Sequence, residues 1–253
     1  MSLHFTPTVE VLDANMAVGH RRDAWQPSDD RSSLLAELDR HGTLEALVFH
    51  NHASSISPTH GQSLLVDWLG GEKRLIPQTC ALPDEASLQL LDRTERDGAL
   101  TSVRIAEVQR YTNLPFTVDF YGPLLRWLAD RRVPLWVPAQ QIDLRDLIPT
   151  LRLFSDLPSV LTGMHYSDSL WVEPIMRQLP MLHLELSRYE PLGQVERLIK
   201  RFGAERFVYG SGYPSYAIGP VIYYLHHCNI SSAQLAAICR NNVKRLLKRD
   251  EPA

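Results

Sequence analysis

The chain has 253 residues, of which 44% are hydrophobic and 22% are charged, and its formal net charge is −3. This composition is typical of a globular protein, and the charge balance argues against the broad basic surface of a nucleic-acid-binding protein. No uninterrupted apolar run approaches the roughly 18 residues that a membrane span needs, so we expect neither nucleic acid nor membrane as a partner.

Short apolar runs alternate with segments of helical periodicity along the whole chain. Helical periodicity is present at residues 33–41, 62–69, 84–97, 123–131, 143–154 and 192–202, and Ser231 and Gln234 form a capping box that starts a last helix. Eight apolar runs are predicted strands: residues 9–15, 46–50, 74–78, 101–106, 134–137, 159–164, 182–187 and 206–210.

Alternating strands and helices predict a parallel sheet covered by helices. Eight repeats in this length favour a closed (β/α)8 barrel, formed as a single domain by residues 1–253, over an open doubly wound sheet. No Gly-x-Gly-x-x-Gly follows a strand, which weakens the dinucleotide-binding alternative. Cys80, Cys228 and Cys239 are far apart and odd in number, and the N-terminus does not read as a signal peptide, so we expect a cytoplasmic protein without disulfides.

Two connections, residues 19–30 and 108–120, are longer than a barrel needs. In such a barrel, the loops that follow the strands build the site. Their aromatic residues either form a wall or lid of the site or pack the loops down: Trp25, Tyr111, Phe116 and Phe120.

Alternation along two strands predicts which side chains point into the barrel. In the run 182–187 the leucines point outward, which turns His183, Glu185 and Ser187 inward, and the run 101–106 turns Arg104 inward. A buried arginine needs a partner, and Glu185 is the best candidate. Either this pair is purely structural, or Arg104 grips a carboxylate or phosphate of a ligand.

Several segments, in their order and spacing, resemble the amidohydrolase-related TIM-barrel family. They include "VEVLDANMAVG", "RLIPQTCALP", "PLLRWLADRRVPLWV", "LPSVLTGMHY", "LHLELSRYE" and "RLIKRFGAERFVYGSGYP", and together they span nearly the whole chain. The resemblance implies a (β/α)8 barrel with its site at the carboxyl ends of the strands. It also implies an enzyme that hydrolyses or decarboxylates small molecules, generally with zinc or another divalent metal.

The metal ligands that this resemblance implies are mostly replaced. Asn15 and Ala17 stand where a His-x-His of the first strand is expected, and Gly212 stands where the last strand carries an aspartate. Only His165 remains near a ligand position. We therefore expect no metal at the usual place, although His50, His52 and His165 form an alternative three-imidazole set.

The residues retained at the strand ends predict a hydrolase, lyase or decarboxylase that acts on a small anionic molecule. His50, His165 and Glu185 are the candidate acid–base groups, and Asp13 is a candidate to orient a donor. The substrate-binding candidates are Asn15, Arg104, Ser211 and Tyr213. The alternative is a catalytically inactive small-molecule-binding or regulatory protein on the same barrel, and a homodimer stays open.

Overall fold

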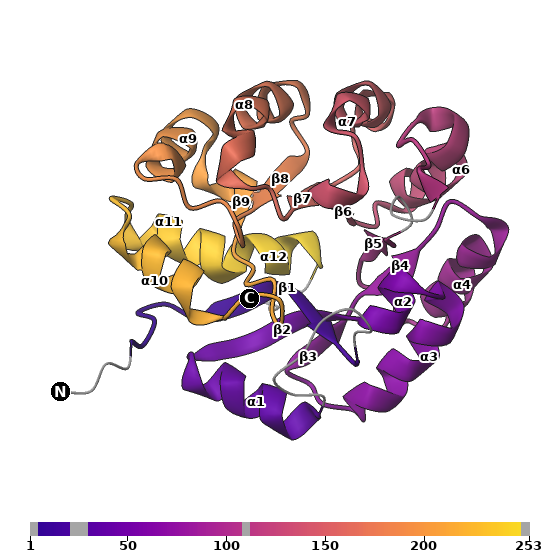
Figure 1. Ribbon diagram of the computed structural model, residues 1–253, viewed down its shortest axis with the longest axis horizontal. Coiled ribbons are helices and arrows are strands. Elements are labelled where there is room, and N and C mark those ends of the chain that lie inside the picture. The colour runs from indigo at the N-terminus through magenta and orange to yellow at the C-terminus, as the bar shows by residue number, and fades with distance from the viewer. Residues whose placement is uncertain (1–4, 21–29, 108–111, 249–253) are drawn as a thin grey trace.

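The computed structural model describes residues 5–20, 30–107 and 112–248. A ring of strands lies at its centre, and helices surround the ring (Figure 1). The strands are β1 (Val11–Val18), β2 (Thr43–His50), β3 (Leu75–Pro77), β4 (Thr79–Ala81), β5 (Val103–Ile105), β6 (Leu135–Pro138), β7 (Ser159–Thr162), β8 (Leu182–Glu185) and β9 (Phe207–Val208). Each of the eight predicted strands corresponds to one position in this ring.

Strands β3 and β4 are two halves of one strand position. β3 pairs with β2, and β4 pairs with β5, in parallel as all the other pairs are. Gln78 lies between the halves, where its main-chain N–H donates to the carbonyl of Val48 at 2.8 Å and its amide donates to Ser102 Oγ at 3.1 Å. The sequence predicts only the first half, because the predicted run of residues 74–78 ends at Gln78, where β3 gives way to β4.

Main-chain hydrogen bonds join β1 to the segment that follows β9. Ala14 N donates to Tyr209 O at 3.0 Å, Ala17 N donates to Tyr213 O at 2.8 Å, and Gly212 N donates to Asn15 O at 2.9 Å. These bonds complete the ring, and the predicted (β/α)8 barrel is confirmed.

Helices follow most strands and cover the outside of the ring. Those not predicted are α2, α8 and α10, of which α2 is only five residues long and α8 carries Pro174 inside it. The helix predicted at residues 123–131 starts earlier than expected. In the structure, α6 begins at Val118 and holds Pro123 in its interior. The helices are α1 (Arg31–Arg40), α2 (Asn51–Ser55), α3 (Pro58–Leu69), α4 (Glu85–Arg96), α6 (Val118–Arg131), α7 (Leu144–Leu151), α8 (Ser169–Gln178), α9 (Gln194–Phe202), α10 (Gly219–His227), α11 (Ser232–Ala236) and α12 (Asn242–Leu246), the last two joined by a π-helical turn, η5 (Ala237–Asn241).

The floor of the barrel is filled by apolar side chains. Trp136 is fully buried there and donates its indole N–H to the carbonyl of Ala14 at 3.0 Å. The floor cluster contains Leu12, Ala14, Leu47, Ile76, Trp136, Val160 and Val208 from the strands, and Val243, Leu246 and Leu247 from α12 and the residue after it. Because this end is packed, polar chemistry has room only at the carboxyl ends of the strands.

Of the four aromatic residues in the two long connections, the two that the structure describes do not line the cavity that is found at the strand ends. Phe116 is fully buried in the core, and Phe120 is 46% exposed on the surface. Trp25 and Tyr111 lie outside the described residues. The three cysteines are free, and within residues 5–20, 30–107 and 112–248 no helix combines the length and apolar character of a membrane span.

Candidate functional site

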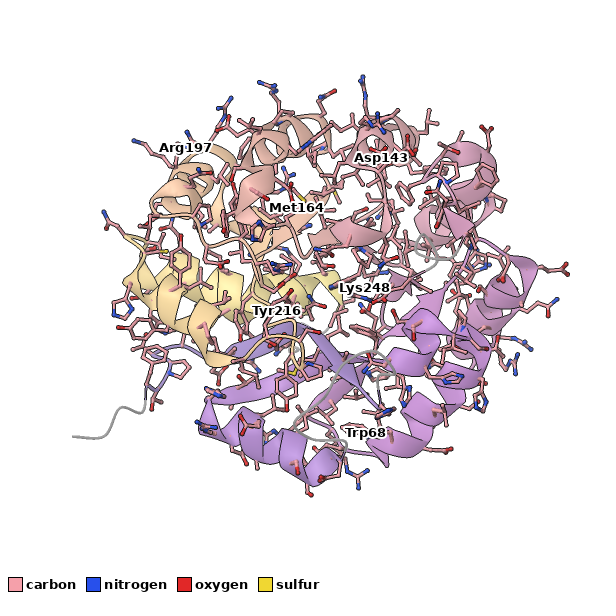
Figure 2. The ribbon with its side chains drawn as sticks, in the orientation of Figure 1. Trp68, Asp143, Met164, Arg197, Tyr216 and Lys248 are labelled. Carbon is pink, nitrogen blue, oxygen red and sulfur yellow. The ribbon has the colours of Figure 1, made fainter. Side chains whose placement is uncertain are left out.

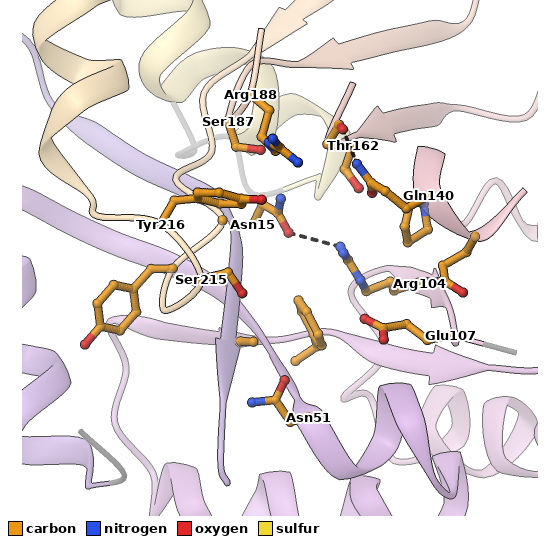
Figure 3. Close-up of a pocket in the computed structure, with 17 residues that line it drawn as sticks. Asn15, Asn51, Arg104, Glu107, Gln140, Thr162, Ser187, Arg188, Ser215 and Tyr216 are labelled. Atoms are coloured by element: carbon orange, nitrogen blue, oxygen red, sulfur yellow. Dashed lines mark hydrogen bonds between the residues drawn. The ribbon is translucent and has the colours of Figure 1, made fainter. Parts of the chain in front are cut away.

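A cavity of about 270 Å³ opens at the carboxyl ends of the strands, where the family resemblance predicts the site. In Figure 2, Arg197 and Asp143 lie at the outer edge of the molecule, whereas Tyr216 lies near its centre. The close-up in Figure 3 shows polar side chains converging on this space from many strand ends. The lining includes Asn15, Ala17, Phe49, Asn51, Arg104, Glu107, Gln140, Gln141, Thr162, Ser187, Arg188, Gly212, Tyr213 and Tyr216.

Arg104 of β5 is the central cation of this cavity. It is only 6% exposed, and its guanidinium lies over the ring of Phe49, 4.1 Å from the ring centroid. Its Nη1 donates to Asn15 Oδ1 at 3.2 Å, which Figure 3 shows as a dashed line. This is the one hydrogen bond of the guanidinium within the described part of the chain, and Nε is buried without a partner. Among the described residues, four of its five N–H groups therefore have no acceptor.

The predicted partner of Arg104, Glu185, reaches it through Asn15. The amide Nδ2 of Asn15 donates to Glu185 Oε2 at 3.1 Å, while Oδ1 accepts from Arg104. The carboxylate also accepts from Gly163 N at 3.1 Å, from Ser187 N at 2.6 Å and from Ser187 Oγ at 2.9 Å. Asn15 is thus a bridge between a buried cation and a buried carboxylate, and Glu185 lies behind the cavity wall.

Burial raises the pKa values of both carboxyl groups beneath the cavity. The pKa of Asp13 is raised to about 7 by desolvation, against hydrogen bonds from Ser211 and Asn15 that lower it. Desolvation also raises the pKa of Glu185, and the hydrogen bonds from Gly163 and Ser187 oppose the shift. A proton on either group therefore costs less than on an exposed carboxylate.

The two candidate catalytic histidines are used as local caps and do not line the cavity. His50 Nδ1 accepts from His52 N at 3.1 Å at the start of α2, and burial lowers the pKa of His50 to about 4. His165 Nδ1 accepts from Ser167 N at 3.2 Å at the start of a short 3₁₀ turn. Next to His165, the side chain of Met164 is fully buried in the core.

The four predicted substrate-binding residues divide into three that line the cavity and one that does not. Asn15, Arg104 and Tyr213 are part of its wall. Ser211 is fully buried, donates its N–H to the carboxylate of Asp13 at 3.0 Å and accepts at Oγ from Tyr213 N at 3.0 Å. Asp13 therefore orients the main chain after β9, as expected of a group that holds a donor.

Several residues of the cavity were not singled out from the sequence, and three of them bear on its chemistry. Glu107 follows β5 directly, Arg188 follows β8, and Tyr216 lies in the segment after β9. Glu107 and Arg188 are each a charged residue just beyond the end of a predicted strand, and this pattern in the sequence could have identified them. The alternation of side chains ends where a strand ends, so it does not predict where a residue beyond that end points.

The donor set does not fit the divalent metal that the family resemblance implies. Both polar atoms of the Asn15 amide are taken by Arg104 and Glu185, and Glu185 already accepts four hydrogen bonds. Gly212 adopts φ +72°, and a Cβ built there would lie 2.9 Å from Tyr216 Cδ2, so an aromatic ring occupies the space of the expected aspartate. A zinc centre needs about three protein ligands and an open position, which these residues do not supply.

The alternative three-imidazole site is not assembled. His50 and His165 each cap a separate helical turn, and the ring of His52 packs edge-on against His60, with centroids 4.9 Å apart. In the parts of the chain that the structure covers, no group of three or more His, Cys, Asp or Glu side chains is arranged to hold a metal ion. The cation at the centre of this barrel is Arg104.

Comparison with known proteins gives structural relatives at low sequence identity. No family model matches the chain, and no curated protein matches it. A 2,6-dihydroxybenzoate decarboxylase complexed with 2,6-dihydroxybenzoate shares 15% identity, with 95% of this chain and 100% of that chain covered and a TM-score of 0.74.

Two further solved structures have the same architecture. A dihydroxybenzoic acid decarboxylase from Polaromonas sp. JS666, with bound manganese and the inhibitor 2-nitroresorcinol, shares 12% identity over 97% of this chain and 98% of that one, with a TM-score of 0.75. A putative amidohydrolase from Staphylococcus aureus shares 11% identity over 95% and 100%, with a TM-score of 0.73. The fold implied by the resemblance to the amidohydrolase-related TIM-barrel family is confirmed.

Proposed function

We propose that this protein is an enzyme that hydrolyses or decarboxylates a small organic acid, bound in the cavity with an anionic group against Arg104. The observation that carries the proposal is the buried guanidinium of Arg104, which uses one of its five N–H groups within the described residues. Buried N–H groups without acceptors are costly, and a ligand carboxylate would accept from the unused N–H groups in pairs.

The walls of the cavity favour a small, flat molecule. Phe49 and Tyr216 supply aromatic surface, and the amides of Asn51, Gln140 and Gln141 supply donors and acceptors for hydroxyl or carbonyl groups. The volume of about 270 Å³ lies at the lower end of the range of small-molecule sites. Two structural neighbours are decarboxylases named for hydroxylated benzoates, which agrees with a ligand of this size and charge.

Glu107 is the carboxylate that we assign to proton transfer. It lines the cavity at the end of the strand that carries Arg104, and its side chain has no hydrogen bond or ion pair within the described chain. In a hydrolysis, ionised Glu107 takes a proton from the attacking water. In a decarboxylation, the C–C bond to the carboxylate breaks, CO₂ leaves, and protonated Glu107 delivers its proton to the carbon that keeps the electron pair.

The test is a screen of small carboxylic acids by thermal shift, followed by an assay for consumption of each acid that binds. Arg104→Met removes the charge, Arg104→Lys keeps it without the planar fork, and Arg197→Gln is a surface control on α9. We expect both Arg104 variants to lose affinity at least tenfold, because a charge-assisted bond is lost or weakened. We expect Glu107→Gln to keep binding and to lower kcat by about a hundredfold or more.

Three outcomes separate the alternatives. The enzyme proposal is supported if an acid binds and is consumed, if both Arg104 variants lose affinity for it, and if Glu107→Gln lowers kcat. An acid that raises the melting temperature but is never consumed supports the binding or regulatory protein instead. Affinity that is the same in the wild type and in both Arg104 variants refutes the proposed site.

A further inference from the structure

The cavity contains a second arginine on the side opposite to the first. Arg104 comes from β5, and Arg188 follows β8, three strand positions further round the barrel. Figure 3 shows both guanidinium groups directed into the same open space, with Asn15 between them. Neighbouring strands lie about 4.8 Å apart, so the two side chains start from well-separated parts of the wall.

Arg188 has no partner of opposite charge in the described structure. Its guanidinium lies over the ring of Tyr216, 4.9 Å from the ring centroid, and it makes no hydrogen bond or ion pair with any described residue. Stacking on an aromatic ring orients a guanidinium but leaves its N–H edge open. The edge of Arg188 is therefore available to an anionic group in the cavity.

The carboxylates near the cavity do not neutralise Arg188. Glu107, the one carboxylate among the described lining residues, follows β5 and faces the side of Arg104. Glu185 lies behind the wall, where its oxygens are occupied by Asn15, Gly163 and Ser187. No carboxylate of the described residues therefore compensates the charge of Arg188 on the far side of the site.

We infer that the ligand carries two anionic groups, one at each end of a small flat body. This inference rests on the proposed function, which concerns the end at Arg104. Arg104 with Glu107 holds the reacting end, and Arg188, fixed by Tyr216, holds a second carboxylate that is not changed by the reaction. Arg188 is then the residue that selects diacids over monoacids.

The experiment compares matched ligands by isothermal titration calorimetry with the full chain. The probes are benzene-1,3-dicarboxylate and benzene-1,4-dicarboxylate, their monomethyl esters, and benzoate. Each ester has nearly the shape of its diacid and lacks one charge. We expect at least one diacid to bind ten- to a hundredfold more tightly than its own ester, because one charge-assisted contact is lost.

The variants assign the second charge to Arg188. In Arg188→Gln, the preference for the diacid over its ester should vanish, while the affinity for the ester and for benzoate stays within about twofold of the wild type. Tyr216→Phe keeps the stacking ring and should keep the preference. Arg197→Gln is the control for loss of a surface charge, because Arg197 is 63% exposed.

The outcomes distinguish this inference from the proposed function. If monoacids and diacids bind equally and Arg104→Met abolishes both, the second anionic group is refuted and the site at Arg104 stands. If the preference survives in Arg188→Gln, Arg188 is not the second anchor, and the inference is likewise refuted. If neither diacids, esters nor benzoate bind at millimolar concentration, both proposals fail for acids of this class.

Discussion

The buried carboxyl group of Asp13 gives a prediction that does not depend on the ligand. Burial raises its pKa from the ordinary value of 3.8 to about 7 in the folded protein. Its Oδ1 accepts from Asn15 N at 2.9 Å and from Ser211 N at 3.0 Å, so an asparagine at this position keeps the acceptor that both main-chain donors use. Asp13→Asn therefore removes the titration and leaves most of the contacts.

The linkage between proton binding and folding fixes the direction in which stability changes with pH. The folded pKa lies above the unfolded one, so the protonated form stabilises the folded state fully below about pH 4, and this stability is lost as the pH rises towards 7. The loss is about 1.4 kcal/mol per pH unit in this window and at most about 4 kcal/mol in total. Between pH 5 and pH 8 the wild type should lose about 2.5 kcal/mol that Asp13→Asn does not lose.

The assay is the free energy of unfolding in urea, measured for both proteins from pH 5 to pH 8. Other groups titrate as well: burial lowers the pKa values of His50 and His183 to about 4, so their stabilisation is lost as the pH falls. These contributions are common to both proteins and cancel in the difference between them. Asp143→Asn is the matched control, because the side chain of Asp143 is 35% accessible and its pKa is lowered to about 2 by hydrogen bonds from Arg145. A difference between wild type and Asp13→Asn that is flat across this range would refute the reasoning.

Three further predictions concern other parts of the structure. Gly212→Ala should lower the free energy of unfolding by about 1–2 kcal/mol, because φ is +72° and the new methyl group meets Tyr216, and a variant as stable as the wild type would contradict the left-handed backbone. Trp136→Phe should cost about 1–3 kcal/mol in a urea titration, because the buried carbonyl of Ala14 loses its donor, and a neutral effect would mean that water replaces it. Dialysis against a chelator should change neither the melting temperature nor the affinity for an acid, because the donor set does not fit a metal, and mass spectrometry that finds one retained zinc per chain would overturn that conclusion.

The fold was predictable because its signals are local and repeated. Apolar runs mark the strands, and alternation correctly turned Arg104 and Glu185 inward, with Arg104 in the cavity wall and Glu185 behind it. Short helices such as α2 were missed because five residues carry no periodicity. The direct pairing of Arg104 with Glu185 was expected on charge alone, and the bridging amide of Asn15 depends on the distance across the barrel, which the sequence does not encode locally.

The candidate site was predictable only in part, because it too depends on geometry that the sequence does not encode locally. His50 and His165 each follow a strand, which favours a place at the site, but their rings turn back to cap the next helical turn. Whether a side chain after a strand turns into the cavity depends on loop geometry. That geometry turns Glu107 and Arg188 into the cavity and the two histidines away from it. Tyr216 could be placed only once the space above Gly212 was known.

The closure of the ring sets the order in which the protein can fold during its synthesis. The backbone of β1 finds its second neighbour in residues 209–213, and Asp13 binds the N–H of Ser211, 198 residues later in the chain. At typical elongation rates, the 198 residues that separate these partners take on the order of 10–40 s to make, so one edge of β1 stays unpaired for that time. The apolar floor stays uncovered even longer, because α12, which covers it, follows residues 209–213 in the chain. An emerging chain with an open strand edge and an uncovered apolar floor is prone to wrong pairing until α12 has been made.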